Sequence, residues 1–211
     1  MRRTFALAAC VCLFSFAVQG WQEPAATYAQ LLEKVNAKDP AADFAALRFA
    51  FMDADAYSPY GGDTASQNAL DAALKEKNYG KAAKLAEKIL ATNFVDISGH
   101  LGASRAQAAL KNSEKAEFHR YVGQGLINSI LQSGDGKTPQ TAYVVISPDE
   151  EYALFNYWGF RTSAQSIVHK DGHVYDLMTG TDQKTNEKVC VYFNVDKPYQ
   201  QITGQVVKKK S

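Results

Sequence analysis

The sequence predicts an α+β fold, with helical hairpins in the first half and a small, mostly antiparallel sheet in the second. In residues 21–132 apolar side chains recur every three or four positions, as they do in amphipathic helices. From residue 138 to 200 the pattern changes to β-branched runs and strict alternation, which is typical of strands. Turn-forming residues fill the stretch between the two halves, Ser133–Thr138, which we interpret as a linker.

Residues 1–20 have the pattern of a secretory signal peptide. Arg2 and Arg3 precede an uncharged apolar run, and small residues offer cleavage near Ala17 or Gly20. The run is shorter than the ~20 residues of a spanning helix, so we expect no stable membrane span. The pattern therefore predicts a bacterial protein that is periplasmic or secreted.

Few cysteines remain for chemistry once this segment is removed. Cys10 lies in a sequence similar to a lipoprotein cleavage box, but too few apolar residues precede it, which favours ordinary cleavage. Cys190 is then the only cysteine of the mature chain, and we expect a buried thiol that packs as a small apolar residue. The sequence predicts no disulfide, no metal site and no cofactor.

The charge balance excludes one class of partner. Without Arg2 and Arg3 the chain has 21 basic and 22 acidic residues. A chain with this charge balance lacks the excess of basic residues that binds nucleic acid, so we expect no nucleic acid as a partner. The lysines near the C-terminus belong to residues 201–211, which we expect to be a frayed, solvated tail.

The first two expected helices lie in the region 25–51. One follows Pro24, and Asp39-Pro40 ends it and caps the next. Each helix has a single apolar face, formed by Tyr28, Leu31, Leu32 and Val35 in the first and by Phe44, Leu47 and Phe51 in the second.

The next four helices form two copies of a repeat. Thr64 and Gln67 have the spacing of a capping box at the start of the first copy. Lys77–Ala82 then matches Lys111–Ala116 at a separation of 34 residues, the tetratricopeptide period. We expect tetratricopeptide-like hairpins with Ala82 and Ala116 at equivalent helix contacts. A generic helical bundle is the alternative.

The sequence of the second half predicts strands and one helix in the order β-α-β-β-β. Thr141–Ile146 is continuously apolar, like a strand that is covered on both faces. Ser147, Pro148 and Glu150 predict a capped helix that ends at Gly159. The remaining strands are Phe160–His169, His173–Met178 and Val189–Val195, the first two joined by a two-residue turn at Asp171-Gly172.

Several stretches occur together in an order that indicates a family. They are Tyr57–Tyr60, Ile130–Gly136, Tyr143–Ser147 with Glu151-Tyr152, Gly159-Phe160, and Tyr192–Val195. In these stretches the chain resembles the bacterial exported family catalogued as domain of unknown function 4919. The resemblance implies export, a helical front half and an α/β back half. It implies no activity and no catalytic residues.

Two groups of polar residues are candidates for chemistry. Asp149, Glu150 and Glu151 lie in the first turn of a helix, whose dipole stabilises negative charge, so we interpret them as structural. In the expected hairpin register His169 lies diagonal to Asp176 on one face, which would let the carboxylate orient a general base. An exposed polar pair is the plainer interpretation of these two residues.

Aromatic residues in the second half suggest a ligand surface. The helix that Tyr157 and Trp158 end cannot bury both of its faces, so we expect ligand binding near Tyr157, Trp158 and His169. Because no full catalytic set can be assembled, we expect a non-catalytic binding module of the cell envelope, whose partner is an envelope protein, a peptide or a glycan. The alternative is an envelope hydrolase that uses His169 and Asp176.

Overall fold

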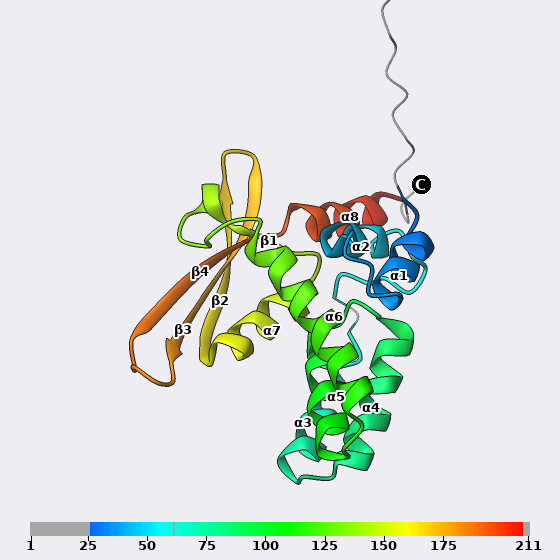
Figure 1. Cartoon of the computed structure of the whole chain (residues 1–211). Helices are drawn as coiled ribbons and strands as arrows, with labels where there is room; N and C mark the ends of the chain where they lie inside the picture. The colour runs from blue at the N-terminus through cyan, green and yellow to red at the C-terminus, as the bar shows by residue number, and fades with distance from the viewer. Residues whose placement is uncertain (1–25, 61, 209–211) are drawn as a thin grey trace, which may run out of the picture.

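The computed structural model describes residues 26–60 and 62–208 (Figure 1). The signal peptide expected at 1–20, with cleavage near Ala17 or Gly20, lies outside the described residues. The helices of the first half are α1 (Tyr28–Asn36), α2 (Phe44–Phe51), α3 (Thr64–Lys75), α4 (Tyr79–Thr92), α5 (Ile97–Ala109) and α6 (Ser113–Leu131). The second half contains a short 3-10 turn (Pro139–Thr141), β1 (Tyr143–Val144), α7 (Pro148–Trp158), β2 (Phe160–Lys170), β3 (His173–Asp182), β4 (Lys188–Asn194) and α8 (Asp196–Lys208).

The structure confirms the α+β class, with the helices mainly in the first half of the chain. The helices α3 to α6 form two hairpins that pack side by side, to the lower right of the sheet in Figure 1. Among the described residues the sheet has four strands in the order β1-β4-β3-β2. Only β1 is parallel to its neighbour, so the sheet is mostly antiparallel as expected.

The two repeat copies form the same turn. Lys77 and Lys111 both have a left-handed backbone, with φ of 56° and 62°. The following amides, those of Asn78 and Asn112, donate to Ala73 and Gln107 in the last turn of the preceding helix, at 2.8 and 2.9 Å. These are the bonds of a Schellman motif, which ends a helix and reverses the chain. The alanines of the two copies, Ala82 and Ala116, are both buried.

Apolar side chains form two clusters of different composition. The larger cluster joins α1, α2, α6, α7 and the sheet, with Leu47, Leu126 and Phe155 fully buried. The smaller cluster lies between α3, α4 and α5 and depends on alanines, which let these helices approach closely. The larger cluster therefore packs α7 both against helices of the first half and against the sheet.

Three helix caps differ from the expectation, although α7 begins at Pro148 and ends before Gly159 as predicted. Asp43 caps α2 and Asp63 caps α3, each accepting from a backbone amide three residues later. The expected capping box at Ser147 does not form, because the Glu150 carboxylate is engaged with Arg48 and with the amide of Ile146. Carboxylates are stronger acceptors than hydroxyls, which explains why Asp63 and not Thr64 takes the cap.

The strands and the C-terminal region bring three further corrections. The first strand is only Tyr143–Val144, because β4 is its single neighbour and the chain turns into α7 directly afterwards. The segment expected as a tail from residue 201 is helical through Lys208, and the Gln201 side chain donates to the Met52 carbonyl at 3.1 Å. Cys190 is exposed, because it points away from the face of β4 that carries buried Val191 and Phe193.

Candidate functional site

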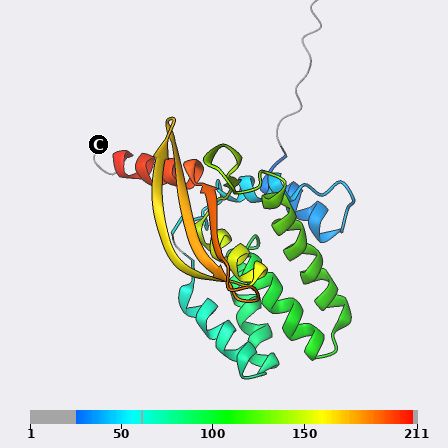
Figure 2. The same cartoon turned by 90° about the vertical axis from the view of Figure 1, so that its left-hand side faces the viewer.

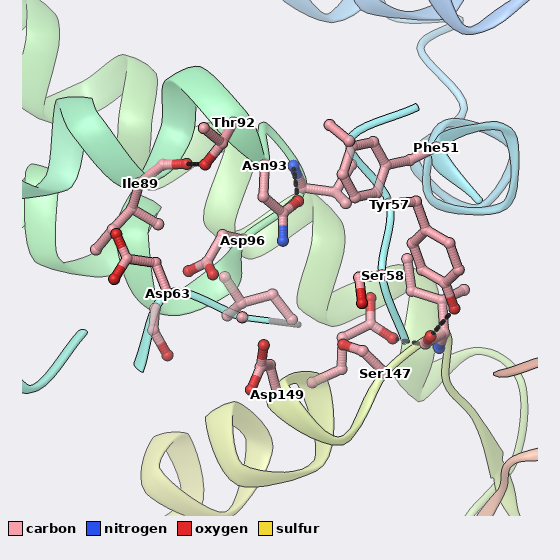
Figure 3. A pocket seen from close by; sticks show the side chains of 17 residues that line it. Phe51, Tyr57, Ser58, Asp63, Ile89, Thr92, Asn93, Asp96, Ser147 and Asp149 are labelled. Atoms are coloured by element: carbon pink, nitrogen blue, oxygen red, sulfur yellow. Dashed lines mark hydrogen bonds between the residues drawn. The ribbon is translucent and has the colours of Figure 1, made fainter. Parts of the chain in front are cut away.

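A pocket of about 260 Å³ lies where the helical half meets the start of α7 (Figure 3). Four segments line it: the end of α2 with the loop that follows, the α4–α5 connection, the start of α5, and the turn into α7. Apolar side chains form part of the wall, among them Phe51, Val95, Ile97 and Ile146. The acidic side chains Asp63, Asp96, Asp149 and Glu150 supply most of its charge.

Asp96 is held rigidly because it caps α5. One of its carboxylate oxygens accepts from the Gly99 amide at 2.6 Å and the other accepts from Gln67 Nε2 at 2.7 Å. Burial raises the pKa of Asp96, while these two hydrogen bonds act in the opposite direction. The carboxylate therefore has a fixed position at the wall of the pocket.

Glu150 is neutralised by a buried arginine. The Arg48 Nε and Nη2 atoms are both 2.6 Å from the Glu150 carboxylate, and Arg48 is only 1% exposed. Arg48 also donates to the Val144 carbonyl at 3.0 Å and to Ser129 Oγ at 3.2 Å. This network ties α2 to α6 and to the first turn of α7, so it fixes the pocket wall that α7 provides.

Asp149 has no hydrogen bond or ion pair within the described part of the chain. Burial raises its pKa first, and the negative charge of Glu150 raises it further. Figure 3 shows its side chain at the pocket, across from Asp96. A side chain at Gly62 would collide with the Asp149 carboxylate, so glycine leaves this carboxylate room.

Asp63 differs because it has a cationic partner. Lys88 Nζ is 3.0 Å from Asp63 Oδ2, and Ser66 donates to the same carboxylate through its amide and its hydroxyl. Hydrogen bonds from Ser66 lower the pKa of Asp63 to about 2. Two carboxylates of the pocket are thus matched by cations, whereas Asp96 and Asp149 are not.

This arrangement suits a positively charged organic group. The described residues contain no group of three or more His, Cys, Asp or Glu side chains placed to hold a metal ion. An ammonium group needs only two or three acceptors and one net negative charge. The pocket offers both, beside apolar side chains that can contact an alkyl stem.

A second acidic group lies on the other side of the first turn of α7. Glu151 is fully buried, Asp176 is 4% exposed, and Gln165 Nε2 donates to both carboxylates at 3.1 and 2.8 Å. Burial, the charge of Asp176 and a hydrogen bond between the two carboxyls raise the pKa of Glu151 well above its usual value. We interpret the pair as two carboxyls that share one proton, because two adjacent carboxylates cannot both ionise in a buried site.

The hairpin register agrees with the one predicted from the sequence. Lys170 pairs with His173, His169 with Val174, and Ile167 with Asp176. The side chains of His169 and Asp176 nevertheless have different neighbours. Asp176 is bonded by Gln165, whereas the His169 ring lies 6.0 Å from the ring of Tyr199 in α8.

The structure does not bring Tyr157 and Trp158 to His169. Both residues end α7 beside the start of β2, whereas His169 lies nine residues further along that strand, roughly 30 Å away at 3.3 Å per residue. Trp158 packs against Tyr143, Phe155 and Phe160, and the Tyr157 hydroxyl is 3.4 Å from Gln124 Oε1.

Sequence reasoning missed the residues that organise the pocket. Arg48 carried the clearest signal, because it is the only charged residue in the apolar helix Phe44–Phe51 and a charge there needs a buried partner. Its partner, Glu150, is 102 positions away and only the tertiary fold pairs the two. Asp96 carried a weaker signal, as an ordinary helix cap.

Comparison with known proteins identifies the family and leaves its activity open. No curated protein and no solved structure matches the chain. A family model described as Domain of unknown function (DUF4919) matches residues 22–203, which is most of the chain. The chain therefore belongs to the family described as domain of unknown function DUF4919.

Proposed function

We propose that the protein is a non-catalytic binding module of the bacterial cell envelope, and that its pocket takes a positively charged group of a peptide. The observation that carries the proposal is Asp149, a solvent-exposed carboxylate without a partner in the described structure, at a pocket that it shares with Asp96. A lysine side chain or a free N-terminus would supply the missing cation and hydrogen-bond donors. The tetratricopeptide-like hairpins that form one wall of the pocket support a peptide as the bearer of that cation.

Location in the envelope rests on the sequence. The start at Arg2-Arg3 and the uncharged run that follows favour export, with cleavage near Ala17 or Gly20. Within residues 26–60 and 62–208, no helix is long and apolar enough to cross a membrane. Fractionation of a Gram-negative host and the intact mass of the product test this part of the proposal.

Calorimetric titration tests the binding role. The probes are a blocked pentapeptide with a central lysine and the same peptide with that lysine acetylated. We expect the lysine peptide to bind and the acetylated one to fail. Asp149→Asn should weaken binding by about 10- to 100-fold, the effect of losing a hydrogen bond to a charged group.

A matched control separates this effect from a general loss of charge. Asp71→Asn removes an equal charge from an exposed position of α3, outside the pocket, and should leave the affinity unchanged. Equal binding of the lysine and acetyl-lysine peptides would contradict the proposal, as would an unaltered affinity in Asp149→Asn.

An envelope hydrolase that uses His169 and Asp176 remains the second candidate function. Asp176 favours it through its pairing with Glu151, because two carboxyls that share a proton can act as acid and base. The positions of the two residues argue against it, because Asp176 accepts a hydrogen bond from Gln165 whereas the His169 ring lies beside Tyr199. A hydrolase substrate screen on the wild type, His169→Ala and Asp176→Ala decides between the two functions: activity that both variants abolish would favour the enzyme.

A further inference from the structure

The strand β2 is a long free edge of the sheet. It stands last in the order β1-β4-β3-β2 and runs for 11 residues, with β3 as its only strand partner in the described structure. Figure 2 shows it as the outermost strand of the sheet. An edge of this kind presents unpaired backbone donors and acceptors to any extended chain that approaches.

The hairpin turn determines which backbone groups face outward. Asp171 and Gly172 have φ of 52° and 80°, the conformation of a two-residue type I′ turn. In such a hairpin the residues next to the turn bond to each other, and the bonding then alternates along the strand. The N–H and C=O groups of Gln165, Ile167 and His169 therefore point away from β3.

The bonds on the far side of β3 agree with this alternation. Val174, which lies opposite His169, accepts from the Val195 amide at 3.0 Å and donates to Asp196 Oδ1 at 2.7 Å. Its backbone groups thus point away from β2. Beyond Ala164 the ladder is irregular, since the register shifts between Thr162 and Ala164. The regular part of the free edge is 164–170.

The side chains of β2 indicate the character of a partner. Ile167 is 57% exposed, one of the most exposed large apolar side chains in the described structure. The strand carries Arg161, His169 and Lys170 and has no acidic residue. Two copies of β2 placed edge to edge would gather Arg161 and Lys170 of both copies at one interface that offers them no acidic partner within the strands, which disfavours self-pairing. The same charges attract a strand with acidic residues.

We propose that the outer edge of β2 is a docking site for an extended peptide segment with acidic flanks, which adds to the sheet as a fifth strand. Its backbone pairs with Gln165, Ile167 and His169, and an apolar side chain at its centre covers Ile167. The acidic flanks lie near Arg161 at one end and Lys170 at the other. This surface is separate from the pocket around Asp149, so the protein would have two places for peptide contact.

Three peptides and three protein variants test this proposal on the full chain. The probe is the peptide Glu-Thr-Thr-Val-Thr-Thr-Asp, followed by fluorescence anisotropy and by the NMR shifts of the backbone amides. The control peptides replace its acidic residues with lysine or its central valine with proline. We expect the acidic peptide to bind and to shift the amides of Gln165, Ile167 and His169 most strongly.

Ile167→Pro removes one outward N–H without removing a bond to β3, as edge positions permit. It should weaken binding by roughly tenfold, the size of one backbone hydrogen bond. Ile167→Thr keeps the N–H and should bind better than the proline variant. Asp149→Asn should leave this affinity unchanged, which separates the edge from the pocket.

Several outcomes would overturn the proposal. Binding by the lysine peptide as tight as by the acidic one would contradict the charge argument. Undiminished binding to a folded Ile167→Pro variant, as judged by circular dichroism, would contradict the strand pairing. Sedimentation that shows self-association through β2, with no peptide binding, would assign the edge to a second copy of the chain.

Discussion

The Arg48 guanidinium holds the Glu150 carboxylate through two hydrogen bonds of 2.6 Å, with both side chains buried. The pair connects α2 with the first turn of α7, across 102 positions of sequence. A buried ion pair of this kind adds little net stability compared with an apolar pair of the same volume. Its main effect is to fix α7, and with it Asp149, at one position relative to the helical half.

Arg48→Met should destabilise the protein by about 3–5 kcal/mol, because the Glu150 charge is then left buried without a partner. Urea denaturation measures this loss. The double variant Arg48→Met/Glu150→Gln removes both charges and should regain a substantial part of it. If the double variant is no more stable than Arg48→Met, the loss comes from packing and not from the orphaned charge.

Near pH 4.5 the Glu151→Gln variant should be about as stable as the wild type. As the pH rises, its free energy of unfolding should become larger than that of the wild type. The pKa of Glu151 is higher in the folded state than in the unfolded chain. The protonated side chain therefore contributes its full stability at pH values below the pKa of the unfolded chain, and this contribution is lost as the pH rises toward the folded-state pKa. The amide keeps the shape of the protonated acid and cannot ionise.

At pH 9 the free energy of unfolding of Glu151→Gln should exceed that of the wild type by roughly 1–3 kcal/mol, the penalty of a buried polar group without its partner. Free energies of unfolding at pH 5, 7 and 9 show the trend. Glu33→Gln, at an exposed position of α1, is the control and should follow the wild type. A gap between Glu151→Gln and the wild type that does not change with pH would refute the shared proton.

The sequence was informative where structure depends on neighbours in the chain. The hairpin register from Lys170 back to Ala164 followed from Asp171-Gly172 alone, because a two-residue turn determines the pairs next to it until an irregularity shifts them, here between Thr162 and Ala164. The turns at Lys77 and Lys111 followed from the repeat. The pocket could not be predicted, because it depends on contacts such as Arg48 with Glu150 that no local pattern encodes.

Acidification should weaken the helical half through His100. His100 Nε2 donates to the Phe94 carbonyl at 2.8 Å, and His100 Nδ1 therefore accepts from His119 Nδ1 at 3.1 Å. Burial, with a smaller effect of His119, lowers the pKa of His100 from 6.5 to about 3. The unfolded chain thus binds a proton between pH 6.5 and 3 that the folded chain does not, and stability falls with pH in that window.

At pH 5 this difference amounts to about 2 kcal/mol, since the pH lies about 1.5 units below the unfolded pKa. Urea midpoints at pH 7.5 and 5 measure it. His100→Gln keeps a donor and an acceptor but cannot take up a proton in this range, so its midpoint should change less between the two pH values. An equal change in wild type and His100→Gln would assign the acid sensitivity to other groups.

Two glycine-to-alanine changes should have opposite effects, because only one glycine is required by packing. Gly102 in α5 lets Leu70 of α3 approach, and a Cβ at this position would lie 2.8 Å from Leu70 Cδ2. Gly80 in α4 has no atom within 4 Å of such a Cβ. Gly80→Ala should therefore stabilise the protein by about 0.5–1 kcal/mol, the gain in helix propensity.

Gly102→Ala makes the same gain in propensity but must displace the buried Leu70 side chain of α3, and overpacking costs about 1–3 kcal/mol. The net result should be a loss of stability and a thermal midpoint below that of the wild type, whereas Gly80→Ala should lie above it. The pair also tests the repeat, because Gly102 follows Leu101 at the position where the tetratricopeptide pattern has its small residue. If Gly102→Ala were as stable as Gly80→Ala, the close approach of α3 and α5 would not be needed for the hairpins to stack.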